Sequence, residues 1–473
     1  MTQGPGRAGW IEMGRPRAFR ADRRTMLRTG VAAVLWTAFG GRAAADPAAA
    51  PLTQDGFSVL QAVPAQAQVA EGAPVAALGY GGATPGPLLR LRKGEELKVR
   101  LVNGLAEPTS LCWPGLRIAN AMAGIAGLTQ PPVPPGGAFD YRFTPPDSGF
   151  NLYRPHVGAA TPGQIARGLY GPIIVDEAAP PPCDLEAVVA LADWRLDEAP
   201  PHELAEAARG QGRIGPVLAA NNRATPLTLT AAPGARVRLR LVNAANARLM
   251  AIRVEGVKPL IIAIDGQPAE AFEPLRNVFP MGPGARFDML FDMPRDATPA
   301  RFILVGGAAA PIAGETDRPL IVFTATGDPL AQRPPLAGLA ANPLLPTEIS
   351  LQRAKRVDIA IAGGGAVPFS VNGKTATAWP AAPLFSVARG APVTLGFANN
   401  TAVAQIIRLH GHVMRLLHAM DDGWEPYWRD CVLIAPGKTS HVAFVADNPG
   451  RWPIESAIPD HMAAGVMTMF AVS

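Results

Sequence analysis

Apolar and polar side chains alternate in three widely separated segments of the chain, residues 94–103, 234–243 and 390–399. Each segment begins with glycine, carries apolar residues three, five and seven positions later, and has asparagine nine positions later. Side chains on a β-strand point alternately to opposite faces of a sheet. The pattern therefore predicts three strands, each with one face on a core and one face in water.

A second pattern follows each of these segments at a similar distance along the chain. It consists of Pro-Gly and then phenylalanine seven residues after the glycine, at residues 135–143, 283–291 and 436–444. Proline and glycine side by side are typical of a tight turn, so each copy reads as a turn that leads into a strand. Because both patterns recur three times in the same order, they predict three related β-sandwich domains.

The repeats and the proline-rich stretches set the expected limits of these domains. Sustained helical periodicity is scarce, and we expect short helices only near residues 203–209 and 461–465. The prediction is an all-β chain with domains at residues 46–178, 179–326 and 347–473 and a proline-rich linker at residues 327–346.

Residues 1–45 resemble an export leader of the twin-arginine type. Arg23 and Arg24 precede a weakly apolar segment, and residues 43–45 form a plausible Ala-Ala-Ala cleavage site. These features predict export to the periplasm by the twin-arginine pathway. Beyond the leader, no apolar run is long enough to predict a transmembrane helix.

The leader also accounts for the basic charge of the chain. It holds eight arginines and two acidic residues, a net charge of +6, whereas the whole chain has +5. The remaining chain is near neutral, which argues against nucleic acid as a partner. Cys112, Cys183 and Cys431 are odd in number and predict no disulfide framework, and we expect a monomer.

Four further segments resemble the copper-binding motifs of multicopper oxidases. Residues 109–116 read T-S-L-C-W-P-G-L, which resembles the family's T-S-x-H-W-H-G-L, and residues 152–156 resemble its W-Y-H-P-H. Residues 408–412 resemble H-L-H-G-H, and residues 446–452 resemble the approach to H-C-H-x-x-x-H. The resemblance covers all three repeats and implies three consecutive cupredoxin-like Greek-key β-sandwich domains.

In that family, one mononuclear copper passes electrons from a substrate to a three-copper cluster that reduces dioxygen. The resemblance implies ten histidine ligands and one cysteine, and most of them are replaced in this chain. Only His156, His410 and His461 remain of the ten histidines. The other ligand positions, including the cysteine and an axial methionine, hold Cys112, Pro114, Arg154, Gln405, Arg408, Glu455, Ser456, Ala457 and Val466.

At the mononuclear position the resemblance places Gln405, Ser456, His461 and Val466. A blue copper centre needs a thiolate and two imidazoles, which this set does not supply. We therefore expect no functional blue copper, and we expect His461 to be a buried, hydrogen-bonded histidine.

At the cluster, the resemblance places His156, His410 and Glu455 around one former copper. Two imidazoles and a carboxylate form a recognised set for one iron, manganese, zinc or copper ion, and Cys112 would add a soft ligand. The alternative is a metal-free cavity in which Arg154 and Arg408 fill the space and pair with Glu455.

Three functions follow from these alternatives. The sequence favours a non-oxidase binding or scaffold protein of the cell envelope without a cofactor, because it resembles the copper-free branch of the family. An exported member of that branch stabilises the cell-division machinery, so envelope or cell-division proteins are the expected partners. The second function is a mononuclear metal-binding protein or oxidoreductase, and the third is a copper oxidase, as the family resemblance implies.

Overall fold

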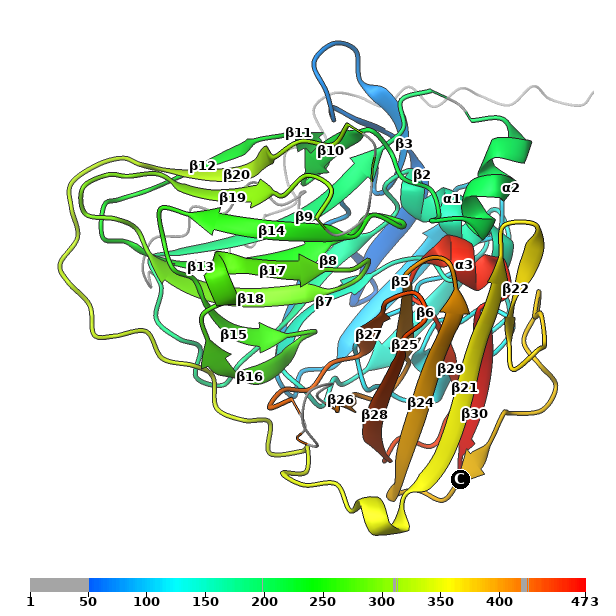
Figure 1. The fold of residues 1–473 in the computed structure, drawn as a ribbon. Helices are drawn as coiled ribbons and strands as arrows, with labels where there is room; N and C mark the ends of the chain where they lie inside the picture. Colours follow the sequence, from blue (N-terminus) through cyan, green and yellow to red (C-terminus); the bar gives the residue numbers. More distant parts are fainter. Residues whose placement is uncertain (1–50, 198, 309–311, 313, 418–422, 424) are drawn as a thin grey trace, which may run out of the picture. The chain divides into compact units, whose positions relative to one another are not determined.

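The computed structural model describes residues 51–473, apart from residues 198, 309–311, 313, 418–422 and 424 (Figure 1). The predicted leader, residues 1–45, lies outside the described residues. Within the described part of the chain, no helix is both long enough and apolar enough to cross a membrane. Strands make up most of the regular structure, which confirms the predicted all-β class.

The first third of the chain forms two sheets. The larger has the order β1-β2-β5-β6, with β3 also paired to β2, and the smaller has the order β4-β8-β7. These strands are β1 (Leu52–Gln54), β2 (Phe57–Ala67), β3 (Val75–Tyr80), β4 (Leu89–Arg92), β5 (Leu97–Asn103), β6 (Ala138–Phe143), β7 (Gly149–Tyr153) and β8 (Gly171–Asp176).

The middle third forms a seven-stranded sheet, β11-β10-β9-β13-β18-β15-β16, and a five-stranded sheet, β12-β20-β19-β14-β17. Their strands are β9 (Leu185–Trp194), β10 (Val217–Ala220), β11 (Arg223–Ala224), β12 (Leu227–Ala231), β13 (Arg236–Asn243), β14 (Met250–Glu255), β15 (Leu260–Ile264), β16 (Gln267–Phe272), β17 (Val278–Met281), β18 (Arg286–Asp292), β19 (Ala300–Leu304) and β20 (Arg318–Ala325).

The last third forms two five-stranded sheets, β22-β21-β24-β28-β26 and β23-β30-β29-β25-β27. Their strands are β21 (Lys355–Gly364), β22 (Val367–Val371), β23 (Ser386–Val387), β24 (Ala391–Thr401), β25 (Gln405–Leu409), β26 (Arg415–Leu416), β27 (Cys431–Ile434), β28 (Thr439–Ala446), β29 (Gly450–Ser456) and β30 (Met467–Val472). The predicted linker, residues 327–346, contains no helix or strand. The exact domain limits remain predictions.

The two sequence patterns form the same strand pair in all three parts. The alternating segments are β5, β13 and β24, and the turn-and-phenylalanine segments lead into β6, β18 and β28. In each antiparallel pair, the phenylalanine lies opposite the first apolar residue of the alternating strand; the pairs are Phe143 with Leu97, Phe291 with Val237, and Phe444 with Val393. The repeat is therefore a structural repeat with a common register.

The asparagine of the pattern forms buried hydrogen bonds to the backbone in each repeat. Asn103, Asn243 and Asn399 are all fully buried. In each copy the side-chain amide donates to two backbone carbonyl groups, and its oxygen accepts from the backbone N–H two residues later. A buried amide with three partners can bridge a strand end to two loops at little desolvation cost.

The prediction of a water-facing side is wrong for the second alternating strand. Arg238 and Arg240 on β13 are only 2% and 0% exposed. Arg238 binds Glu177 and Asp288, each at 2.6 Å, and Arg240 binds Glu186 and Asp288, each at 2.8 Å. Carboxylates on adjacent segments can compensate the arginine charges, so this strand is buried on both faces.

Three α-helices lie close together near the candidate site. They are α1 (Thr161–Ala166), α2 (Pro201–Arg209) and α3 (Pro459–Ala463), and α3 packs beside both others. Short 3-10 helices are η1 (Asn120–Met122), η2 (Gly158–Ala160), η3 (Leu275–Asn277) and η4 (Leu351–Arg353). The sequence predicted α2 and α3 within two residues at their ends, whereas it missed α1, which has only six residues.

Candidate functional site

Three buried side chains from the first and last parts of the chain meet at one point. His156 follows β7, His410 follows β25, and Glu455 lies on β29. Because β25 and β29 are adjacent antiparallel strands, His410 and Glu455 are held by the same sheet. The His156 backbone N–H donates to the Ser110 hydroxyl at 3.0 Å, and this hydroxyl donates back to the His156 carbonyl at 2.8 Å. The His410 N–H donates to the Pro453 carbonyl at 3.1 Å, so both histidines are anchored through the backbone.

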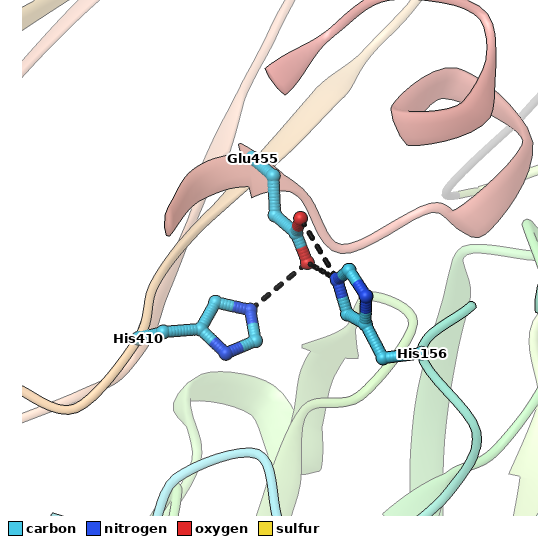
Figure 2. A group of neighbouring side chains, drawn as sticks. All are labelled: His156, His410 and Glu455. Atoms are coloured by element: carbon cyan, nitrogen blue, oxygen red, sulfur yellow. Dashed lines mark hydrogen bonds and ion pairs between the residues drawn. The ribbon is translucent and has the colours of Figure 1, made fainter. Parts of the chain in front are cut away.

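Figure 2 shows both imidazole rings directed at the Glu455 carboxylate. His156 Nε2 lies 2.9 Å from Oε1 and 3.0 Å from Oε2, and His410 Nε2 lies 2.9 Å from Oε1. The exposed fractions are 3% for His156, 5% for His410 and 2% for Glu455. A carboxylate accepts hydrogen bonds only, so without an ion these contacts are hydrogen bonds when both Nε2 atoms carry the proton. We call the three residues the His–Glu–His triad.

The electrostatics keep Glu455 ionised at neutral pH. Burial alone would raise the pKa of this carboxyl, but the two adjacent imidazoles outweigh burial and hold its pKa well below the ordinary value. Burial lowers the pKa of His410 despite the nearby carboxylate. The triad is consequently a buried carboxylate whose oxygens already accept hydrogen bonds from the protein.

The donor set of the triad suits a single metal ion, but its surroundings fit one less well. The three ligand atoms lie within 4.8 Å of one another, and two imidazoles with a carboxylate are a common metal site. A metal on His156 Nε2 would move the ring proton to Nδ1. That atom is buried and has no hydrogen-bond partner among the described residues, whereas metal-bound histidines almost always donate this proton to an acceptor.

The structure does not pair Glu455 with the two arginines of the cavity. Among the described residues, no ion pair within 4 Å joins Arg154 or Arg408 to Glu455. Arg408 instead donates to the Gly284 carbonyl at 3.3 Å, and its Nε lies 3.6 Å from Asp430. The expectation of an arginine–glutamate pair was therefore wrong, because the two imidazoles already occupy the carboxylate.

Arg154 and Cys112 lie beside the triad without joining it. Their backbones form an isolated antiparallel bridge, and Pro114 follows in a buried turn. Burial raises the pKa of the Cys112 thiol to about 12, and its sulfur is not part of the group of ligand atoms around Glu455. Burial and repulsion by Arg408 lower the pKa of Arg154 to about 10. Without an ion beside it, burial thus favours the neutral thiol of Cys112.

A second group of buried acidic residues was missed by the sequence. Asp265 and Asp430 lie close together with Cys431, and Arg286 donates to Asp430 at 2.8 Å. Burial raises the pKa of Asp265, whereas Arg286 and Arg408 outweigh burial and lower the pKa of Asp430 to about 2. Asp265 and Asp430 are 165 residues apart in the chain, and no local motif connects them.

The residues at the mononuclear copper position also come together, but they bind one another. His461 Nε2 lies 2.9 Å from the Gly210 carbonyl, to which it donates, and Nδ1 lies 3.2 Å from Gln405 Oε1. A neutral ring with its proton on Nε2 accepts at Nδ1, so it binds Gln405 when the amide turns its NH2 group toward the ring. The Ser456 hydroxyl accepts from the backbone N–H of Ile458, and the Val466 N–H donates to the His461 carbonyl at 2.9 Å. Burial lowers the pKa of His461 to about 4, so the ring is neutral at pH 7.

Ala457, the next former ligand position, is fully buried, and its N–H donates to the Ile406 carbonyl at 2.7 Å. Its methyl group offers no ligand atom. The only sulfur among all these positions belongs to Cys112, which lies at the cluster and not at the mononuclear position. The described residues at the former copper ligands therefore provide neither the thiolate nor the ring of imidazoles that the family's centres need.

Comparison with known proteins identifies the family of this chain. Models of the multicopper oxidase family match residues 61–180, 187–319 and 342–473. Multicopper oxidase MmcO of Mycobacterium tuberculosis is 29% identical over 91% of this chain and 90% of its own length.

Solved structures agree with this assignment. The multi-copper oxidase from Pseudomonas thermotolerans is 30% identical, with a TM-score of 0.76 over 88% of this chain and 98% of that one. Lac15 from a marine microbial metagenome is 31% identical, with a TM-score of 0.72 over 88% and 99%. These matches confirm the cupredoxin-like fold and the resemblance seen in the motifs: the chain belongs to the multicopper oxidase family.

Proposed function

We propose that this protein is a non-oxidase member of its family that works without copper centres, as a binding or scaffold protein of the cell envelope. One observation carries the proposal. The ionised Glu455 stands where the family has a histidine, and both remaining cluster histidines already donate to it. The triad is complete as a hydrogen-bonded unit, so the fold does not depend on a metal to compensate this buried charge.

The mononuclear position supports the same proposal. An oxidase of this family needs a copper there to accept electrons, and Ser456 replaces the thiolate on which that copper depends. The Ser456 and His461 side chains are instead used in hydrogen bonds within the protein. Without a site that accepts electrons, dioxygen reduction has no electron supply even if a metal reaches the triad.

The proposed location and partners rest on the sequence. A twin-arginine leader would deliver the folded protein to the periplasm. The near-neutral body, with no basic surface indicated by its composition, fits recognition of envelope proteins such as those of the cell-division machinery. This part of the proposal is an analogy with the copper-free branch of the family.

Metal analysis of the purified mature protein tests the proposal. Cells supplied with copper, iron, manganese and zinc should yield a folded protein without a stoichiometric metal and without the intense visible band of a copper–thiolate bond. The same analysis of His156→Ala should give an equally low metal content. A blue colour with dioxygen consumption would restore the copper oxidase and overturn the proposal.

A mononuclear metal site is the second candidate, and the convergence of the three triad ligand atoms favours it. One tightly bound colourless or weakly coloured metal ion per chain, lost in both His156→Ala and Glu455→Gln, would establish it in place of the metal-free triad. The binding role has a separate readout. If the protein works by binding a partner, the Glu455→Gln variant, which keeps the side-chain shape, should restore the normal phenotype of a strain that lacks the gene.

A further inference from the structure

We propose that Arg154 and Arg408 form a buried binding site for one small inorganic anion, next to the His–Glu–His triad. This inference goes beyond the proposed function, because it concerns a ligand of the cavity and does not depend on a partner protein. It rests on two neighbouring buried guanidinium groups and on the acceptors that they lack.

Arg408 has unused donors deep in the protein. Its exposed fraction is 1%. Its one hydrogen bond from the guanidinium among the described residues goes from Nη2 to the Gly284 carbonyl, at 3.3 Å. Its Nε and Nη1 are buried without a hydrogen-bond partner in the described part of the chain, and the Nε contact to Asp430, at 3.6 Å, is too long for one.

The turn that contains Gly284, just before β18, packs directly against the Arg408 guanidinium. Gly284 has a φ of +79°, and a Cβ atom there would lie 2.3 Å from Arg408 Nη2. The same Gly284 carbonyl also accepts from Arg286 Nη1 at 2.8 Å. Among the described residues, Arg408 therefore shares its one carbonyl acceptor with another arginine, so most of its hydrogen-bond donors stay unused although Asp430 offsets part of its charge.

Arg154, from the first third of the chain, is a second buried arginine close enough to feel the charges of Arg408 and Glu455. Its exposed fraction is 7%, and its side chain forms no hydrogen bond or ion pair with any described residue. Arg408 is the strongest neighbouring charge, and it repels Arg154. Two like charges so well removed from water are costly unless a negative charge lies between or beside them.

The nearby carboxylates leave these donors without a hydrogen bond. Glu455 accepts from the two imidazoles, and Asp430 accepts from Arg286 at 2.8 Å and lies 3.6 Å from Arg408 Nε, so it offsets part of the Arg408 charge without a hydrogen bond to it. An anion would therefore find the free donors of Arg408 and Arg154 without displacing an existing bond. Guanidinium groups are always charged in proteins and bind anions in a planar, forked geometry. Their burial limits the ligand to a few atoms, such as chloride, bromide or nitrate.

Thermal unfolding of the chelator-dialysed mature protein tests this site. The unfolding midpoint is measured with sodium bromide replacing sodium gluconate at constant ionic strength. Because a ligand that binds only the folded state stabilises it, we expect a saturating rise of the midpoint with bromide. Arg154→Met should abolish this rise. The control Arg236→Met removes a buried arginine that is already paired with Asp292, and it should keep the rise.

An equal rise in Arg154→Met, or no rise in the unchanged protein, would overturn the site in favour of water or nonspecific salt effects. If Arg154→Met does not fold, crystals of the unchanged protein soaked in bromide decide the matter. The site predicts an anomalous bromide peak between the two guanidinium groups, and the absence of that peak would overturn it. Metal content is measured on the same sample, so a failure here is distinguishable from a failure of the metal-free proposal.

Discussion

The two regions where the family binds copper have lost their ligands in different ways. At the mononuclear position, the replacing residues are neutral and all come from the last third of the chain. One partner comes from elsewhere: the Gly210 carbonyl, which accepts a hydrogen bond from His461. At the cluster, the residues come from several domains and are mostly charged: Arg154, Arg408 and Glu455, with Asp430 and Arg286 beside them.

This difference shows how a lost metal site is filled. Neutral side chains at the mononuclear position are satisfied by hydrogen bonds to nearby backbone groups, and no ligand is needed. Buried charges at the cluster need polar partners, and the protein supplies hydrogen-bond donors for Glu455 but leaves two nitrogen atoms of Arg408 without acceptors among the described residues. The former cluster is therefore the region that retains the capacity to bind a ligand.

The largest effect should follow from breaking the triad. Glu455→Ala removes the buried charge and leaves two imidazole N–H groups without an acceptor, so we expect a loss of about 3–5 kcal/mol in unfolding free energy. Urea denaturation measures it. Glu455→Gln keeps the shape and one acceptor oxygen and should lose about 1–3 kcal/mol. A Glu455→Ala loss below about 1 kcal/mol would mean that the triad contributes little to the cluster region.

The mononuclear region should contribute, through His461, to the pH dependence of the free energy of unfolding. His461 has a folded pKa of about 4 and an unfolded pKa of about 6.5. Between these values the unfolded chain binds more protons, so stability is present at neutral pH and is lost as the pH falls below about 6.5.

From pH 7 to pH 5 this histidine should account for about 2 kcal/mol of the loss in unfolding free energy. His461→Gln should lack that share and so have a shallower pH slope. Equal slopes in both proteins would show that His461 is not a buried neutral ring.

Restoring copper ligands at the mononuclear position would test whether this region lacks only those ligands. Ser456→Cys alone should change stability by about 1 kcal/mol or less and should give no copper–thiolate colour, because only one imidazole is present. The double variant Gln405→His, Ser456→Cys restores two imidazoles and a thiolate, so it should bind copper with an intense visible band. Colour in the single variant would mean that the site supplies a further copper ligand besides the introduced sulfur and His461, and would contradict the account of this position.

The smallest effect is expected from metal removal. Dialysis of the unchanged protein against a chelator should leave its thermal unfolding midpoint the same, because neither region needs an ion for a buried charge. A clear drop of the midpoint, reversed by adding back one metal, would favour the mononuclear site at the triad.

The sequence predicts the fold better than the site. The alternating strands, their phenylalanine partners and the family resemblance follow from local patterns, and the structure gives all three copies one register. The resemblance also grouped His156, His410 and Glu455. It could not show which partner Glu455 takes, because the choice between imidazoles and arginines depends on side-chain directions across two domains.

Other features depend on contacts that no local pattern encodes. The burial of Arg238 and Arg240 requires Glu177 and Asp288 from distant segments. Asp430 likewise depends on Arg286, which lies 144 residues away in the chain. In both cases a charge that looks solvated in the sequence is buried, because a distant partner compensates it.

A crystal structure of copper-exposed protein, with anomalous data collected at the copper absorption edge, tests the central claim most directly. The account predicts no anomalous peak at the triad and direct contacts of 2.9 Å from the His156 and His410 Nε2 atoms to Glu455. A copper peak with both Nε2 atoms and the carboxylate at about 2.0–2.2 Å would contradict it.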